Sequence, residues 1–240
     1  MTGTIYELFI AAAVFVGSHF GISSTALRDD LVRRLGERAY LALYSAVALI
    51  LLAWLVRAYT HVDNPWVLWI RPPLLVVLPI VVMPLALLLF VGGYSQRNPT
   101  AVMQGKRLAT DRPAPGVLAI TRHPLMWGIG LWAAVHLIIS DNVASIIFFG
   151  AIAILAFCGT RAIDARKQRI WPREDWQRFA AATSNIPFAA VFTSRNEIKI
   201  SEIGWWRILL AGVLDIALMV LHPGVLGNLV GVNLFSPAPS

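Results

Sequence analysis

The segment Thr121-Arg122-His123-Pro124 brings a cation, an imidazole and a proline to the start of an apolar run. Proline suits the first helical position, because its ring holds a helical φ and no intrahelical N–H bond is lost there. We therefore expect a helix to begin at this segment, with His123 at its entrance. A neutral imidazole both donates and accepts, so His123 can be a loop anchor, a general base or a metal ligand.

A second polar turn, Thr183-Ser184-Asn185, follows a short amphipathic segment that begins after Pro172. Proline and two acids favour a helix start there, and aromatic residues on one face indicate a short cytoplasmic helix at the membrane interface. The hydroxyls of Thr183 and Ser184 can hydrogen-bond a ligand. A turn that only caps the preceding helix is the alternative.

The composition places these polar segments in a membrane protein. The 240 residues are 58% hydrophobic and 14% charged, too apolar for an ordinary soluble domain. The apolar residues fall in runs near the roughly 20 residues that cross a bilayer as a helix. The sequence thus predicts an all-α, polytopic transmembrane bundle in a single domain, residues 1–240. Its six expected spans are 5–22, 40–56, 74–92, 125–140, 143–159 and 205–221.

The basic residues alternate with these spans. The first, third and fifth loops contain 17 Lys and Arg residues, and the second and fourth contain two. By the positive-inside rule the odd loops are cytoplasmic and both termini lie on the outer side. The net charge of +7 therefore reflects membrane topology, and we expect no nucleic-acid partner.

This topology gives each histidine a depth. His19, at the end of the first span, and His123, at the start of the fourth, both lie near the cytoplasmic face. Two histidines at one level on two helices form the usual site of a b-type haem in membranes. Arg122, with Arg161 and Arg166 as further candidates, can neutralise the haem propionates.

Other metal chemistry fits the sequence less well. A zinc site needs at least one more ligand at this level, and Cys158, the only cysteine, is more typical of a small buried hydrophobe. A single cysteine excludes an internal disulfide, and without a C-x-x-C-H motif the haem cannot be covalently attached.

A second polar level lies deeper in the expected bundle. Asp215, His136 and Glu7 each fall within or near an apolar span, where an ionisable group is costly unless it has a partner. We expect Asp215 and His136 to form a hydrogen bond, directly or through one water. A proton or substrate path is the alternative role.

Three motifs resemble the NnrU family of integral membrane proteins: Gly17-Ser18-His19 with Ser23-Ser24, Thr121-Arg122-His123-Pro124 with Gly128, and Thr183-Ser184 with Pro187-Phe188. The resemblance implies a bacterial inner-membrane protein with one of two roles. Bacterial members are linked with denitrification, in nitrite and nitric oxide reduction. A plant member uses haem b to isomerise a cis double bond of a carotenoid polyene, and its two haem-ligating histidines correspond to His19 and His123.

A competing resemblance is to the isoprenylcysteine carboxyl methyltransferase-like membrane enzymes, which use S-adenosylmethionine. Their motif Arg-His-Pro-x-Tyr-x-Gly matches here, except that Met126 takes the tyrosine position. Their acidic pair is missing, and Asp164-Ala165 is the nearest match. These departures weaken a methyltransferase function while leaving room for a shared fold.

The sequence therefore predicts a membrane protein that binds one haem b through the metal ligands His19 and His123, with Arg122, Thr183 and Ser184 completing the cofactor site. Membrane lipid is one expected partner, and an apolar polyene substrate or proteins of denitrification are the others. A non-enzymatic assembly factor is the remaining class.

Overall fold

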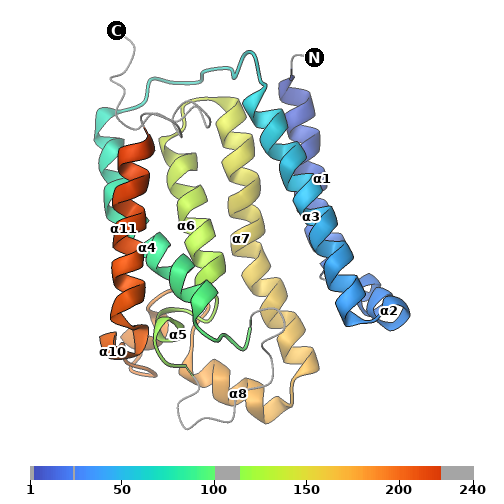
Figure 1. The fold of residues 1–240 in the computed structure, drawn as a ribbon, viewed down its shortest axis with the longest axis vertical. Helices are drawn as coiled ribbons and strands as arrows, with labels where there is room; N and C mark the ends of the chain where they lie inside the picture. Colours follow the sequence, from blue (N-terminus) through green and yellow to red (C-terminus); the bar gives the residue numbers. More distant parts are fainter. Residues whose placement is uncertain (1–2, 24, 101–113, 223–240) are drawn as a thin grey trace. The chain divides into compact units, whose positions relative to one another are not determined.

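The computed structural model describes residues 3–23, 25–100 and 114–222, and most of these residues are helical (Figure 1). They contain two isolated bridges and no strand. The elements in chain order are α1 Ile5–Ser23, α2 Ala26–Leu35, α3 Glu37–Thr60, the 3-10 turn η1 Pro73–Val76, α4 Val77–Ser95, α5 Val117–Ile120, α6 Pro124–Ile139, α7 Val143–Ile170, α8 Arg173–Ala182, α9 Ala189–Phe192, α10 Ile200–Ile203 and α11 Trp205–Leu221.

Each of the six expected spans corresponds to one helix, which confirms the all-α membrane bundle. Within the described residues, four helical segments are long and apolar enough to cross a membrane: α1, α3, η1 with α4, and α7. The apolar helix α6 is shorter, with 16 residues, and α11 has 17. A helix satisfies all its backbone hydrogen bonds internally, so apolar runs of this length adopt it in lipid.

Helix α7 differs from its expected span, because it continues to Ile170 instead of ending at residue 159. The additional residues are polar but include the good helix formers Ala, Arg, Lys and Gln. Pro172, the N-cap of α8, is the first residue that stops the helix. This extension carries Asp164 beyond the apolar part of the helix.

The chain divides into two compact units, and the prediction of a single domain over residues 1–240 stays a prediction. The first unit comprises Met1–Pro79, Ala133–Leu155 and Leu221–Ser240, and the second comprises Ile80–Trp132 and Ala156–Val220. The first unit therefore contains α1 to α3, and the second unit contains most of α4 and all of α8 to α10.

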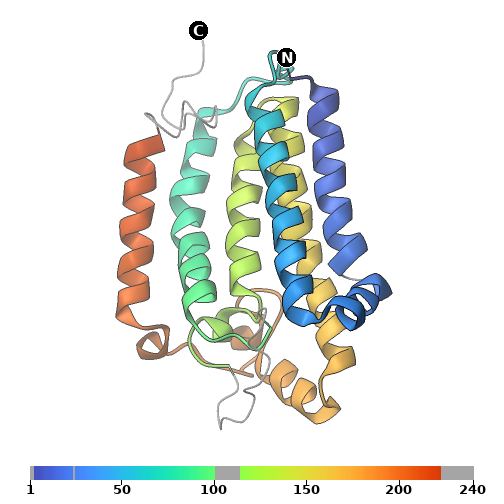
Figure 2. The ribbon, with the colours of Figure 1, turned by 45° about the vertical axis from the view of Figure 1, so that its right-hand side comes forward.

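In the first unit, α1 and α3 lie side by side (Figure 2). The buried residues Leu8, Ala12 and Phe15 recur on one face of α1 at helical spacing. Gly17 and Gly21 are exposed, and a Cβ added to either would meet no heavy atom within 4 Å. These two glycines therefore lie off the buried face of α1.

In the second unit, a buried cluster of Leu89, Val117, Ile120 and Ile203 joins α4, α5 and α10. Helices α4 and α6 pack closely at glycines. A Cβ on Gly128 would lie 2.7 Å from the Ala86 carbonyl oxygen, which no real side chain allows. The close packing of α4 and α6 thus depends on the absence of a side chain at Gly128.

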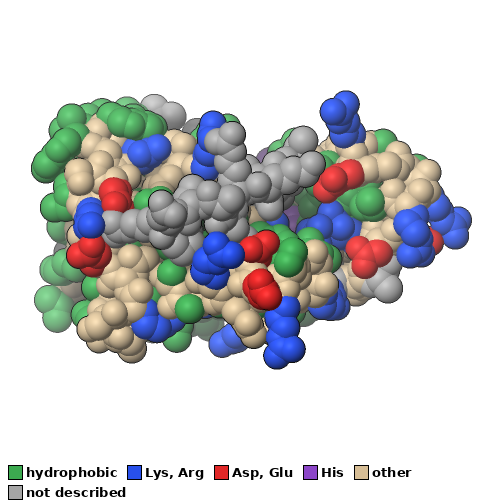
Figure 3. All heavy atoms as spheres, turned by 90° about the horizontal axis from the view of Figure 1, so that it is seen from below, with side chains coloured by type: hydrophobic (Ala, Val, Ile, Leu, Met, Phe, Trp, Pro, Cys, Tyr) green, Lys and Arg blue, Asp and Glu red, His purple; other side chains and the backbone are tan. Residues whose placement is uncertain are grey.

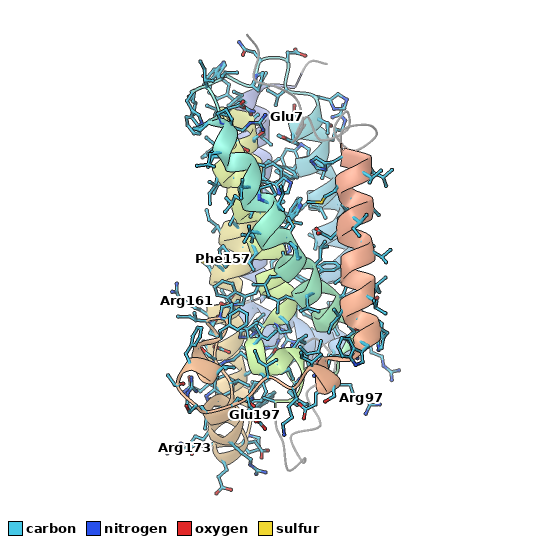
Figure 4. The ribbon with its side chains drawn as sticks, turned by 90° about the vertical axis from the view of Figure 1, so that its left-hand side faces the viewer. Glu7, Arg97, Phe157, Arg161, Arg173 and Glu197 are labelled. Atoms are coloured by element: carbon cyan, nitrogen blue, oxygen red, sulfur yellow. The ribbon has the colours of Figure 1, made fainter. Side chains whose placement is uncertain are left out.

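The expected amphipathic helix is confirmed as α8. Its apolar face is covered by the protein itself, since Trp176 and Phe179 are buried and pack with Trp171. Charged side chains of both signs are visible at the end of the molecule that carries α8 (Figure 3). In the second unit, Arg161, Arg173 and Glu197 lie toward this end, beyond Phe157 (Figure 4).

Candidate functional site

The segment Thr121 to Pro124 joins α5 to α6 in the second unit. Thr121 is the extended C-cap of α5, and α6 begins at Pro124, as the motif predicted. The His123 N–H donates to the Thr121 hydroxyl at 3.3 Å, which closes the turn locally. His123 is buried, with only 2% of its surface exposed. A polar ring at this depth requires a partner.

That partner is Asp164, on the polar extension of α7. Its Oδ1 lies 2.7 Å from Nε2 of His123, the distance of a strong charge-assisted hydrogen bond. Its Oδ2 lies 3.6 Å from Nη1 of Arg122. One carboxylate therefore contacts both side chains of the Arg122-His123 pair, and its position on α7 sets the orientation of the imidazole.

Asn185 links the surrounding segments to this carboxylate. Its Nδ2 donates to the Thr160 hydroxyl at 3.0 Å and lies 3.5 Å from Oδ2 of Asp164. Its Oδ1 accepts from the Trp127 indole N–H at 3.3 Å, and its carbonyl accepts from the Thr121 hydroxyl at 2.7 Å. Asn185 thus ties α6, α7 and the turn after α8 together around the His123–Asp164 pair.

Arg122 is held from several sides. The Arg122 guanidinium stacks over the Trp176 ring at 5.6 Å, and the backbone N–H of Arg122 donates to the Ser184 carbonyl at 2.9 Å. Burial lowers the pKa of the guanidinium, while the Asp164 carboxylate opposes that shift. Its Nε is buried and makes no hydrogen bond in the part of the chain that the structure describes. Arg122 therefore has capacity for an anionic group.

The turn at Thr183 and Ser184 lies beside the Arg122 segment, so the structure brings these predicted site residues together with His123. Thr183 is fully buried and its hydroxyl donates to the Phe179 carbonyl at 2.7 Å, which matches the capping role. Arg195 donates from Nη1 to the Thr183 carbonyl at 2.8 Å and to two carbonyls at the end of α8. A ligand role for Thr183 or Ser184 stays a prediction.

His19 belongs to the first unit, where its surroundings are aromatic. Its Nδ1 lies 2.7 Å from the Phe15 carbonyl oxygen one turn earlier. Its ring lies 4.6 Å from the Phe15 ring and 5.7 Å from the Tyr44 ring of α3. Since His19 and His123 lie in different units, their pairing on one iron stays a prediction.

Three further ionisable residues lie within or near the expected spans, namely Glu7, His136 and Asp215. Glu7 accepts from the Trp54 indole N–H at 3.3 Å, so this acid has a partner within the first unit. His136 is buried and stacks on Phe149 at 4.9 Å. Asp215 belongs to the other unit, so its bond with His136 stays a prediction.

No group of three or more His, Cys, Asp or Glu suited to a metal ion occurs among the described residues.

The three arginines expected near the haem propionates, Arg122, Arg161 and Arg166, differ in exposure. Arg161 is exposed, whereas Arg122 and Arg166 are half-buried. Of the three, Arg122 is the one that shares a carboxylate with His123. The assignment of any of them to a propionate stays a prediction.

Sequence reasoning missed Asp164 as the partner of His123, and it missed Asn185, which contacts Asp164. A signal was present, because Thr160 and Asp164 are four residues apart and so share one face of a helix. Ending the span at residue 159 hid that relation. No spacing in the sequence pointed to Asn185, because the residues that it contacts lie 21 to 64 positions away in the chain.

The chain is similar to known proteins over most of its length. A family model described as NnrU protein matches residues 7–230. The chain is 31% identical over 190 residues to the 15-cis-zeta-carotene isomerase, chloroplastic, of Arabidopsis thaliana. The aligned region covers 76% of this chain and 49% of the plant protein. The chain thus spans about half the length of that curated relative. No solved structure matches.

Proposed function

Because the chain belongs to the NnrU family, we propose that it is an integral membrane haem b protein that isomerises a cis double bond of an apolar polyene. The observation that carries the proposal is the 31% identity, over 190 residues, to a plant protein named as a carotene isomerase. The family model, which matches residues 7–230, includes both histidine motifs. The link with denitrification has no comparable support and stays a prediction.

The hydrogen bonds of the two histidines bear on how each would bind iron. An axial histidine usually has one ring nitrogen held by a hydrogen bond while the other binds the metal. Nδ1 of His19 is held by the Phe15 carbonyl, which leaves Nε2 for iron. Nε2 of His123 is held by Asp164, so binding iron through this nitrogen would require the imidazole to release Asp164. His19 and His123 would hold the iron, and the buried Nε of Arg122 suits a propionate.

The bound haem would supply a metal–π interaction that lowers the barrier to rotation about a conjugated double bond. The protein residues would bind the iron, fix the imidazole orientation and exclude water. Burial of His123 and of the hydrophobic cluster around Val117 supports the last role. Such a substrate is apolar, so it would reach the protein from membrane lipid. We place the protein in a bacterial inner membrane with both termini periplasmic, as the charge distribution indicates.

Two measurements test this proposal. The first is the absorption spectrum of the detergent-purified protein, oxidised and then reduced, where we expect the split bands of a six-coordinate haem b. The second is chromatography of 15-cis-zeta-carotene, the polyene in the relative's name, after incubation with the reduced protein. His19→Ala and His123→Ala should abolish both signals. His61→Ala is the matched control, because that histidine is exposed and bonds its own helix end.

A haem spectrum with no change in the polyene would refute the isomerase and leave the haem assignment standing. A colourless wild-type protein would refute both. The methyltransferase alternative has one observation in its favour, since Asp164, the nearest match to the acidic pair of those enzymes, is the residue that contacts His123. Saturable binding of S-adenosylmethionine to colourless protein would support that alternative.

A further inference from the structure

The loop that runs from the end of α3 to η1 contains five consecutive apolar residues, numbers 66–70, with the sequence Trp-Val-Leu-Trp-Ile (Figure 1). We call these residues the apolar loop segment. All five side chains are exposed, from 44% for Trp69 to 81% for Ile70. Single exposed apolar residues are common, but a contiguous exposed run marks a surface that binds another apolar surface.

The backbone of the apolar loop segment is held in place by hydrogen bonds. The Leu68 N–H donates to the Asp141 carbonyl at 2.8 Å, and the Trp66 carbonyl accepts from the Val143 N–H at 3.1 Å. Asp141 lies in the turn between α6 and α7, and Val143 begins α7, so both belong to the same unit as the loop. The exposure of the five side chains is therefore a property of an ordered backbone.

Trp66 adopts a left-handed backbone conformation, with a φ of 51°. A bulky residue rarely adopts a positive φ, because its Cβ then crowds the backbone. The Trp66 N–H donates to the Asn64 side chain at 3.2 Å, so hydrogen bonds to its N–H and its carbonyl hold this conformation. Strained residues persist where the surrounding structure fixes them, and they are common at sites of function. The fold thus maintains an exposed tryptophan at a conformational cost.

The apolar loop segment continues the exposed apolar surface of two membrane-spanning segments. Before it, α3 is long and apolar enough to cross a membrane and carries the exposed side chains Leu52 and Val56 in its second half. After it, Leu74 is exposed at the start of the spanning segment formed by η1 and α4. Because a span enters the bilayer on each side of the loop, the loop lies at the bilayer surface.

The conformation and composition of the apolar loop segment suit a shallow depth in the lipid. In the hydrocarbon core a backbone outside a helix or a closed barrel is not stable, because water is absent and its polar groups need partners. Residues 66–70 lie outside the helices, so the boundary between headgroups and acyl chains is their favourable depth. Tryptophan is enriched at this boundary, because its ring is apolar and its N–H is polar.

We propose that the apolar loop segment is a membrane anchor. Its side chains enter the boundary between headgroups and acyl chains, while its backbone stays bonded to the turn between α6 and α7. The partner is the phospholipid bilayer. Interfacial tryptophans help to set the tilt of the helices that carry them, so the anchor fixes the tilt and depth of α3. The anchor needs neither haem nor a polyene, and so it is independent of the proposed function.

The test measures the depth of single labelled cysteines. The full-length protein first carries Cys158→Ala, which removes its one cysteine. Val67→Cys and Ile70→Cys then place a fluorescent label in the apolar loop segment. Asp63→Cys is the matched control, because Asp63 is an exposed residue of the same loop outside the apolar run. The protein is placed in phosphatidylcholine nanodiscs, in which part of the lipid carries a nitroxide on the acyl chain near the headgroup, and iodide is the quencher in the water.

We expect the nitroxide lipid to remove at least about half of the emission at positions 67 and 70, because side chains at this boundary lie about 5 to 10 Å deep. Iodide should quench these two labels less than the label at position 63. Labels at positions 67 and 70 that respond to both quenchers as the label at position 63 does would overturn the proposal. The segment would then be a surface that binds another protein.

Discussion

Replacing Gly128 by alanine tests the packing that places His123. Gly128 lies four residues after Pro124 on α6, where the helix contacts α4. A Cβ at this position would lie 2.7 Å from the carbonyl oxygen of Ala86 and 2.8 Å from the backbone nitrogen of Phe90. Both atoms belong to the backbone of α4, so no side-chain rotation can relieve the clash.

The size of the effect follows from these distances. An ordinary contact begins at 3.4 Å, so the helices must separate by at least 0.7 Å near Ala86. Overpacking of this kind costs about 1 to 3 kcal/mol. Alanine regains up to about 1 kcal/mol of helix propensity. With the full gain in helix propensity the net loss is about 0 to 2 kcal/mol, which lowers the midpoint by up to roughly 8 °C in a chain of this length.

The assay is thermal unfolding of the detergent-solubilised protein, followed by the fraction that remains monodisperse on size exclusion. Gly212→Ala is the matched control, because it lies in α11 of the same unit and its added Cβ meets no atom within 4 Å. We expect Gly212→Ala to be neutral or slightly stabilising. Equal midpoints for the two variants would show that α4 and α6 are not in the close contact described above.

Two further predictions follow from the fold and its charges. Arg195→Ala should lower stability by about 1 to 2 kcal/mol in the same thermal assay, because Nη1 of Arg195 donates to three carbonyls at the end of α8. Arg178→Ala breaks only an exposed ion pair, so it should change stability by less than about 1 kcal/mol. A reporter fused after Ser240 should read the periplasmic side, because 17 of the 19 loop cations lie in the odd loops, and a cytoplasmic reading would mean that the span count is wrong.

The sequence by itself determined the six helices and the start of α6 at Pro124. The physical reason is that these features are local. An apolar run in lipid satisfies its backbone only as a helix, and a proline at the first helical position needs no distant partner. The same locality explains the amphipathic α8, whose proline, acids and aromatic face are all within ten residues. The family motifs pointed to His123 and to the Thr183 turn by residue type alone.

Only the tertiary structure decided which nitrogen of His123 is engaged. The bond to Asp164 joins residues 41 positions apart, and it depends on α7 continuing past its apolar part. Asn185 acquires its contacts where three segments of the chain come together in the fold, and the spacing of residues in the sequence does not predict such contacts. The packing at Gly128 likewise depends on the backbone of α4, a helix that begins 51 residues earlier. Contacts of this kind are selected by the geometry of the folded chain, so residue type and spacing cannot predict them.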